Sequence, residues 1–118
     1  MKQFSQTIIV DESMTAEKLG SGLLAVFSTP SMIALMENTA MQMIELPAGE
    51  SSVGTSIHAE HLKASKPGEE ITCTAYLTEV DGRKCRFNLE VTDKSGQLVG
   101  KGTHERFVID IDRFMARL

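Results

Sequence analysis

The sequence STPSMIALMENTAMQMIEL, residues 28–46, decides the fold, because it has the pattern of one long apolar helix within a chain of 118 residues. Thr29 is suited to the N-cap and Pro30 to the first helical position, while Pro47 and Gly49 end the helix near Glu45. At 100° per residue one stripe collects Met32, Met36, Thr39, Ala40 and Met43. Apolar residues continue around much of the remaining surface, so we expect the helix to be buried along most of its length.

After the helix the pattern changes to a period of two, which is typical of strands with one buried face. In VGTSIHAEHL, residues 53–62, the apolar positions Val53, Ile57 and Ala59 share one phase, and His61 has the same phase. We therefore expect His61 on the face of the sheet that meets the helix. Further strands are expected at residues 7–10, 71–78, 85–92 and 98–111, and a short helical turn at 112–118, whereas residues 15–27 fit no single element.

Asp81-Gly82 marks a β-hairpin between two alternating segments. A two-residue loop would set odd-numbered residues opposite even-numbered ones and would mix apolar with charged side chains on each face. A three-residue loop instead pairs Leu77 with Phe87. We therefore predict an odd-length loop or a β-bulge at Gly82.

The two cysteines lie apart in this register. Cys73 opposes Val91 and Cys85 opposes Glu79, so the thiols are not cross-strand neighbours and we expect no disulfide. Two cysteines without the spacing of a disulfide framework suit a reducing compartment. No segment resembles a signal peptide, and the expected location is the cytoplasm.

Two glycines interrupt the last long strand, residues 98–111. Gly100 and Gly102 mark a close approach of another element, for which the buried helix is the natural candidate. One long helix followed by an antiparallel meander predicts a single α+β domain over residues 1–118. In this domain a curved antiparallel sheet of about five strands wraps the central helix, which is the shape of the hotdog fold.

Charge and composition exclude several classes of function. The chain has 12 Lys and Arg against 16 Asp and Glu, so it lacks the basic surface that nucleic acid requires. No apolar stretch is long enough to cross a membrane. The Cys-x-x-Cys, Gly-rich phosphate-loop and His-Glu-x-x-His motifs are absent from the sequence, so a zinc site or a nucleotide site lacks its usual sequence support.

Three dispersed residues remain as candidates for chemistry. Glu37 lies at the margin of the apolar helix stripe, where it is either a solvated side chain or a desolvated carboxylate that acts as a base or nucleophile. His61 is either a hydrogen-bonded core histidine or a proton donor. Thr29 is adequately explained as an N-cap, and His104 as a strand residue that pairs locally with a carboxylate.

The order and spacing of several short motifs resemble those of the fluoroacetyl-CoA thioesterase family of hotdog proteins. These motifs are Val26-Phe27-Ser28-Thr29, Met32, Leu35-Met36-Glu37, Val53-Gly54-Thr55, His61, Pro67-Gly68 and Gly102-Thr103-His104-Glu105-Arg106. Together they cover residues 26–114. The resemblance implies hydrolysis of an acyl-CoA thioester to a free acid and CoA without a metal or separate cofactor.

The same resemblance assigns roles to residues. The catalytic set falls on Thr29, Glu37 and His61, in a homodimer or tetramer whose site combines helix and sheet residues of two chains. The backbone N–H of Gly54 is a candidate to hold the thioester carbonyl. Substrate contacts are also expected at Leu23, Phe27, Pro67 and Gly68. The segment that contains Leu23 and Leu24 carries aromatic residues in the family's namesake, so the acyl preference is left open.

Two alternatives remain beside hydrolysis. One is a non-catalytic acyl-CoA-binding module, because a fold does not fix a function. The other is an acyl-CoA hydratase or dehydratase, which would also use an acidic residue and a histidine. Near Pro67-Gly68, Lys63 and Lys66 are candidates to meet the CoA phosphates, and an ordinary solvated loop is the competing interpretation.

Overall fold

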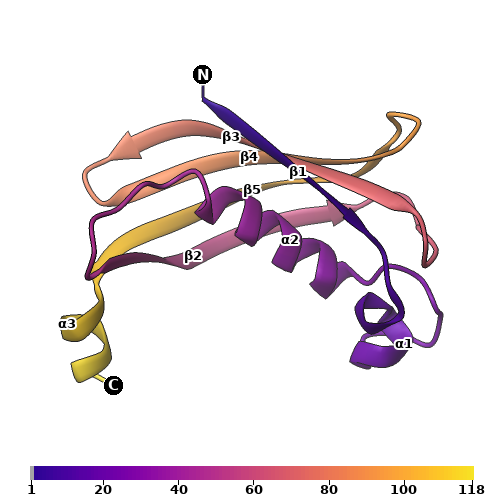
Figure 1. Cartoon of the computed structure of the whole chain (residues 1–118), viewed down its shortest axis with the longest axis horizontal. Coiled ribbons are helices and arrows are strands. Elements are labelled where there is room, and N and C mark those ends of the chain that lie inside the picture. The colour runs from indigo at the N-terminus through magenta and orange to yellow at the C-terminus, as the bar shows by residue number, and fades with distance from the viewer. Residues whose placement is uncertain (1) are drawn as a thin grey trace.

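The computed structural model describes residues 2–118 as a curved five-stranded antiparallel sheet that wraps one central helix (Figure 1). The strand order is β1-β3-β4-β5-β2, so β1 and β2 form the two edges. The elements are β1 Gln3–Ile9, η1 Glu12–Met14, α1 Ala16–Leu19, α2 Thr29–Met41, β2 Glu50–His61, β3 Glu70–Asp81, β4 Lys84–Asp93, β5 Leu98–Asp110 and α3 Ile111–Ala116. This architecture confirms the predicted fold class.

The first turn of α2 differs from the prediction in a way that matters for the site. Ser28, not Thr29, is the N-cap, and its Oγ accepts a hydrogen bond of 3.1 Å from the backbone N–H of Ser31. Thr29 is instead the first helical residue, so its hydroxyl is free to contact another element. The helix also ends at Met41 rather than near Glu45, and Gln42 forms its C-cap.

The core lies between α2 and the concave face of the sheet. It combines the predicted helix stripe with alternating sheet residues: Met32, Leu35, Met36 and Ala40, together with Ile71, Cys73, Ala75, Leu89, Val91 and Val99. Gly100 permits the close approach of α2, since a methyl group there would collide with Met32 Sδ. Gly102 permits the close approach of β2 instead, since a methyl group there would collide with the backbone of His58. The expectation about the helix is thus right for only one of the two glycines.

The β3–β4 hairpin has the predicted register, but the irregularity that produces this register lies elsewhere than predicted. Leu77 pairs with Phe87 as expected. The extra residue is Thr78, where the register shifts, and the hairpin itself closes through the two residues Gly82–Arg83. The predicted bulge at Gly82 is therefore wrong in position, although a bulge is what aligns the apolar faces.

The bulge also changes the neighbours of one cysteine. Cys73 pairs with Val91 as predicted, but Cys85 pairs with Val80 rather than with Glu79. Both thiols are buried and free.

A second bulge, in β2, changes which residues of this strand face the helix: even-numbered residues before the bulge and odd-numbered residues after it. Its register with β5 shifts between Gly54 and Ser56, so Thr55 is an extra residue. Before the bulge the even-numbered Gly54 faces α2, whereas Val53, which was expected to share the inward phase, does not. After the bulge the predicted phase holds, and His61 lies on the helix side.

The ends of the chain add polar strand pairing and a short helix. β1 begins at Gln3, four residues before the predicted Thr7, because hydroxyl pairs join Ser5 to Thr74 and Thr7 to Thr72 across the sheet. The predicted C-terminal helical turn is α3. Within residues 2–118 no helix is long and apolar enough to span a bilayer.

Candidate active site

Thr29 and His61 meet where the start of α2 faces the end of β2. Thr29 Oγ1 lies 2.9 Å from His61 Nδ1, within hydrogen-bonding distance. The Phe27 ring and the imidazole form a T-shaped contact, with centroids 6.1 Å apart and planes at 79°. Burial lowers the pKa of His61, which favours the neutral ring near pH 7. Within residues 2–118 no group hydrogen-bonds to the buried Nε2 atom.

This pair borders a cleft of about 340 Å³ between the segment before α2 and the loop after β2. Phe27, Thr29 and His61 line it together with Leu62 and Lys63. Leu23 does not, since its side chain is 91% exposed on the loop between α1 and α2. Of the substrate contacts expected from the sequence, Phe27 therefore lies at this cleft and Leu23 lies outside it.

Glu37 belongs to a second cluster, nearer the middle of α2. Its carboxylate faces the inward side of Gly54, where a methyl group would lie only 3.0 Å from Glu37 Oε2. The same methyl group would lie 3.1 Å from His104 Cε1 and 3.6 Å from Arg106 Nη1. Glycine at position 54 therefore leaves a small space that a carboxylate, an imidazole and a guanidinium surround.

Arg106 is buried in this cluster, with only 7% of its surface exposed. Its Nε donates to Ser52 Oγ at 2.8 Å, and its Nη2 donates to the Ser52 carbonyl at 2.9 Å. Burial lowers the pKa of Arg106, and the nearby charge of Glu37 opposes that shift. An arginine remains charged despite such shifts, so a positive group is held beside the Glu37 carboxylate.

His104 lies between Arg106 and the β2 backbone. Its Nδ1 is 2.7 Å from the Ser56 carbonyl oxygen, and its Nε2 is 3.2 Å from Arg106 Nη1. Burial, and to a smaller extent the charge of Arg106, lower the pKa of His104, whereas its hydrogen bond to Ser56 acts in the opposite direction. The predicted local pairing of His104 with a carboxylate is thus replaced by contacts to a carbonyl and a guanidinium.

The two clusters stay apart within one chain. Gly54 and His61 are seven residues apart on β2, which corresponds to about 23 Å of strand. Thr29 and Glu37 are eight residues apart on α2, or about 12 Å of helix. The structure brings Thr29 to His61 and Glu37 to Gly54, but it does not bring Glu37 to His61 within the same protomer.

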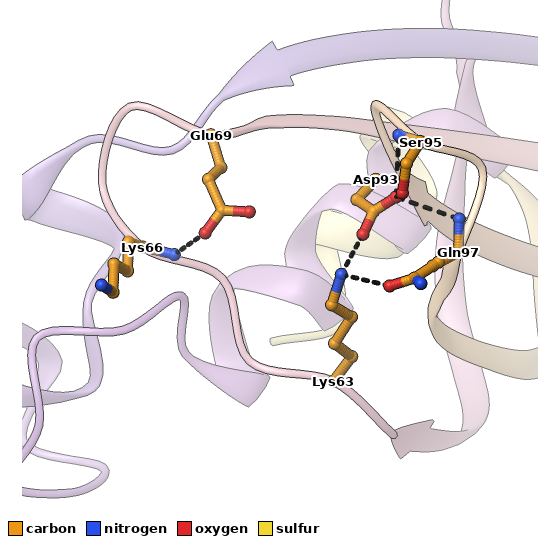
Figure 2. Close-up of polar contacts among 6 residues, drawn as sticks. All are labelled: Lys63, Lys66, Glu69, Asp93, Ser95 and Gln97. Atoms are coloured by element: carbon orange, nitrogen blue, oxygen red, sulfur yellow. Dashed lines mark hydrogen bonds and ion pairs between the residues drawn. The ribbon is translucent and has the colours of Figure 1, made fainter.

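Lys63, two residues after His61, anchors the loop that follows β2 (Figure 2). Its ammonium pairs with Asp93 and donates to Gln97 Oε1 at 2.7 Å. The other oxygen of Asp93 accepts the backbone N–H groups of Ser95 and Gln97 at 3.0 and 2.9 Å. These contacts hold the pKa of Asp93 well below its usual range, with the hydrogen bond from Lys63 as the largest cause. Lys63 thus fastens the loop to the β4–β5 turn.

The turn at Pro67–Gly68 belongs to the same loop. Gly68 adopts a φ of 94° and donates its N–H to the Val10 carbonyl at 2.7 Å. Earlier in the loop, the Ser65 carbonyl accepts the N–H of Phe27 at 2.8 Å. These hydrogen bonds connect the loop to β1 and to the segment before α2. Pro67 and Gly68, which were expected to contact substrate, are not among the residues that line the cleft.

Ser52, His104 and Arg106 are buried polar residues for which the sequence predicts no role at the site. A signal for two of them is present, because even-numbered residues of β5 face inward from Gly102 to Val108. A histidine and an arginine in the buried phase of a strand require partners. Their partners come from β2 and α2, which lie about fifty residues or more away in sequence.

A helix wrapped by such a sheet, with a Thr–His pair at its start and a half-buried carboxylate beside a buried histidine and arginine, defines a hotdog-fold thioester hydrolase. The comparisons identify the family. The family model for fluoroacetyl-CoA-specific thioesterase matches residues 10–112, and the chain belongs to this family. The fluoroacetyl-CoA thioesterase of Streptantibioticus cattleyicolor is 38% identical over 95 residues, which cover 79% of this chain and 68% of the relative.

Solved structures agree with this assignment. A point mutant of the fluoroacetyl-CoA-specific thioesterase, in complex with fluoroacetate and CoA, superposes with a TM-score of 0.90 at 32% identity and covers 96% of each chain. A hypothetical protein of Thermus thermophilus from the thioesterase superfamily has a TM-score of 0.88 at 25% identity over 98% of this chain and 86% of its own.

Proposed function

We propose that this chain hydrolyses a small or medium acyl-CoA thioester to the free acid and CoA, with Thr29, Glu37 and His61 as the catalytic set and no metal ion. The observation that carries the proposal is the Thr29–His61 contact at the cleft, where the buried Nε2 of a neutral imidazole has no partner among residues 2–118. A thioester carbonyl or its leaving sulfur is a suitable partner for that atom.

Each residue of the set has a distinct task. The carboxylate of Glu37 either removes a proton from the attacking water or attacks the carbonyl carbon itself. In the first route the water oxygen bonds to the acyl carbon and the carbon–sulfur bond breaks. In the second route the carbon–sulfur bond breaks as Glu37 forms an anhydride with the acyl group, and water then cleaves this anhydride to release the acid and restore the carboxylate. In both routes the CoA sulfur leaves as a thiolate that takes up a proton. His61 donates toward the carbonyl or that sulfur, and Thr29 orients the imidazole. The N–H of Gly54 is a candidate donor to the developing oxyanion.

The separation of the two clusters supports a homodimer with shared sites. The outer edge of β2 has no strand partner among the described residues, and an exposed twelve-residue edge favours pairing with another chain. If two copies of β2 pair antiparallel about a two-fold axis between Ile57 and His58, Gly54 lies opposite the partner's His61. That register brings Glu37 of one protomer to the Thr29–His61 pair of the other, twice per dimer.

The cellular setting and the choice of acyl group complete the proposal. Both cysteines are buried as free thiols, which suits the reducing cytoplasm.

Leu23 and Leu24 are exposed on the segment before α2, next to the cleft rather than in it. We therefore expect the acyl preference to include groups other than fluoroacetyl.

Release of CoA, followed with a thiol-reactive dye, tests the activity. The substrates are acetyl-, fluoroacetyl-, medium-chain and arylacetyl-CoA, and the variants Glu37→Ala and His61→Ala are assayed in parallel. We expect turnover with at least one ester and its loss in both variants, at unchanged oligomeric mass by light scattering. Tight binding of esters without release of CoA would contradict hydrolysis and would favour a binding module instead. Wild-type turnover in Glu37→Ala would contradict the proposed catalytic set.

A further inference from the structure

The buried polar chain behind Glu37 includes a residue that no step of the proposed hydrolysis uses. It runs from the Ser56 carbonyl through the His104 ring to the Arg106 guanidinium, and Arg106 faces Glu37 across the space at Gly54. We propose that His104 is a positioning residue that holds the Arg106 guanidinium beside the Glu37 carboxylate. This inference rests on the proposed role of Glu37 in hydrolysis.

The hydrogen bonds of His104 are compatible with only one form of its ring. A carbonyl oxygen only accepts, so the proton is on Nδ1, which donates to Ser56. A guanidinium only donates, so Nε2 must carry a lone pair to accept from Arg106 Nη1. A protonated imidazolium would set two donors and two positive charges against each other. With 2% of its surface exposed, His104 has no access to water that could relieve such a contact.

The β2 bulge sets up this arrangement. Thr55 is the extra residue, and directly after it the Ser56 carbonyl accepts from the His104 ring at 2.7 Å. Ser52, before the bulge, receives two further donors of the same guanidinium. Three directed hydrogen bonds therefore fix Arg106. Without His104, the Nη1 group loses a buried acceptor, and the guanidinium is free to turn toward Glu37 and displace its carboxylate.

A double-mutant cycle on turnover tests the proposal. His104→Leu removes the acceptor at similar volume, and we expect kcat to fall about tenfold with KM within about twofold. His104→Gln retains an acceptor in the amide oxygen, and we expect it to stay within about threefold of wild type. In the Arg106→Gln variant, adding His104→Leu should lower kcat further by less than about twofold, because the effect of His104 passes through Arg106. Arg86→Gln, at an exposed arginine that pairs with Glu79 and Glu105, is the matched control and should keep wild-type turnover.

Independent losses that multiply in the double variant would overturn the proposal, as would wild-type kcat in His104→Leu. A measurement on the unmodified protein keeps the test decisive if the leucine variant does not fold. Nitrogen-15 NMR of the His104 ring at neutral pH should show a proton on Nδ1 and a lone pair on Nε2. The opposite tautomer or an imidazolium would overturn the proposal. Because this measurement needs no turnover, it separates a failure of this inference from a failure of the proposed hydrolysis.

Discussion

Replacement of Gly54 by alanine is a sharp perturbation of the proposed site. The φ angle of Gly54 is not positive, so alanine acts through its methyl group rather than through backbone strain. That methyl group would lie 3.0 Å from Glu37 Oε2 and 3.1 Å from His104 Cε1, whereas ordinary contacts begin at 3.4 Å. The carboxylate is the end of a flexible side chain and must retreat by a few tenths of an ångström. His104 has less freedom because it is buried and hydrogen-bonded on both ring nitrogens.

These contacts predict a modest loss of stability and a large loss of activity. Overpacking of this kind costs about 1–3 kcal/mol, which lowers the melting temperature of a domain this size by about 4–12 °C. Displacement of a catalytic carboxylate is more costly to turnover, and we expect kcat to fall at least about tenfold. Differential scanning fluorimetry and CoA release measure the two effects, with Ser56→Ala, at an exposed neighbour, as the control. A folded Gly54→Ala protein with wild-type kcat would refute the role assigned to the Glu37–Gly54 contact.

Three further predictions concern other parts of the structure. Thr29→Val, which removes the hydroxyl 2.9 Å from His61 Nδ1, should lower kcat about tenfold, and Thr29→Ser should restore it; equal kcat in both variants would contradict this role. Because the pKa of Asp93 is lowered in the folded protein, its carboxylate stabilises the fold at pH values above its unfolded-state pKa of about 4. This stabilisation is lost as the pH falls below that value. Asp93→Asn should therefore melt lower at pH 7 and lose less between pH 5 and 3, and parallel melting curves against pH would contradict the Lys63 anchor. Both cysteines are buried, and burial raises the pKa of Cys73 to about 11. A thiol-reactive dye should therefore label the native protein slowly and the denatured protein rapidly.

The main elements of the fold could be predicted from the sequence because their periodicities are strong. The apolar stripe of α2 and the alternation of the strands are local patterns, and the β3–β4 register followed from matching Leu77 with Phe87. The bulges at Thr55 and Thr78 could not be located in the same way. Threonine is common in regular strands, so neither residue marks an extra position, and only the pairing with the neighbouring strand shows it.

The candidate site was predictable only in part, for related reasons. The phase of β2 placed His61 toward the helix, because the bulge lies before that segment. The Thr29 contact was missed because Ser28 and Thr29 are both good N-cap residues, and only the helix geometry chooses between them. The Arg106–His104 pair depends on β2–β5 pairing, which a single-sequence pattern does not contain.

Mixing two inactive variants tests the shared catalytic site most directly. Glu37→Ala and His61→Ala homodimers are each expected to release no CoA. After subunit exchange, about half of the dimers are mixed, and each mixed dimer has one intact site if Glu37 of one protomer acts with the partner's His61. We therefore expect recovery of about one quarter of wild-type CoA release. No recovery, with exchange verified by mass spectrometry of the mixed dimer, would contradict a site built from two chains.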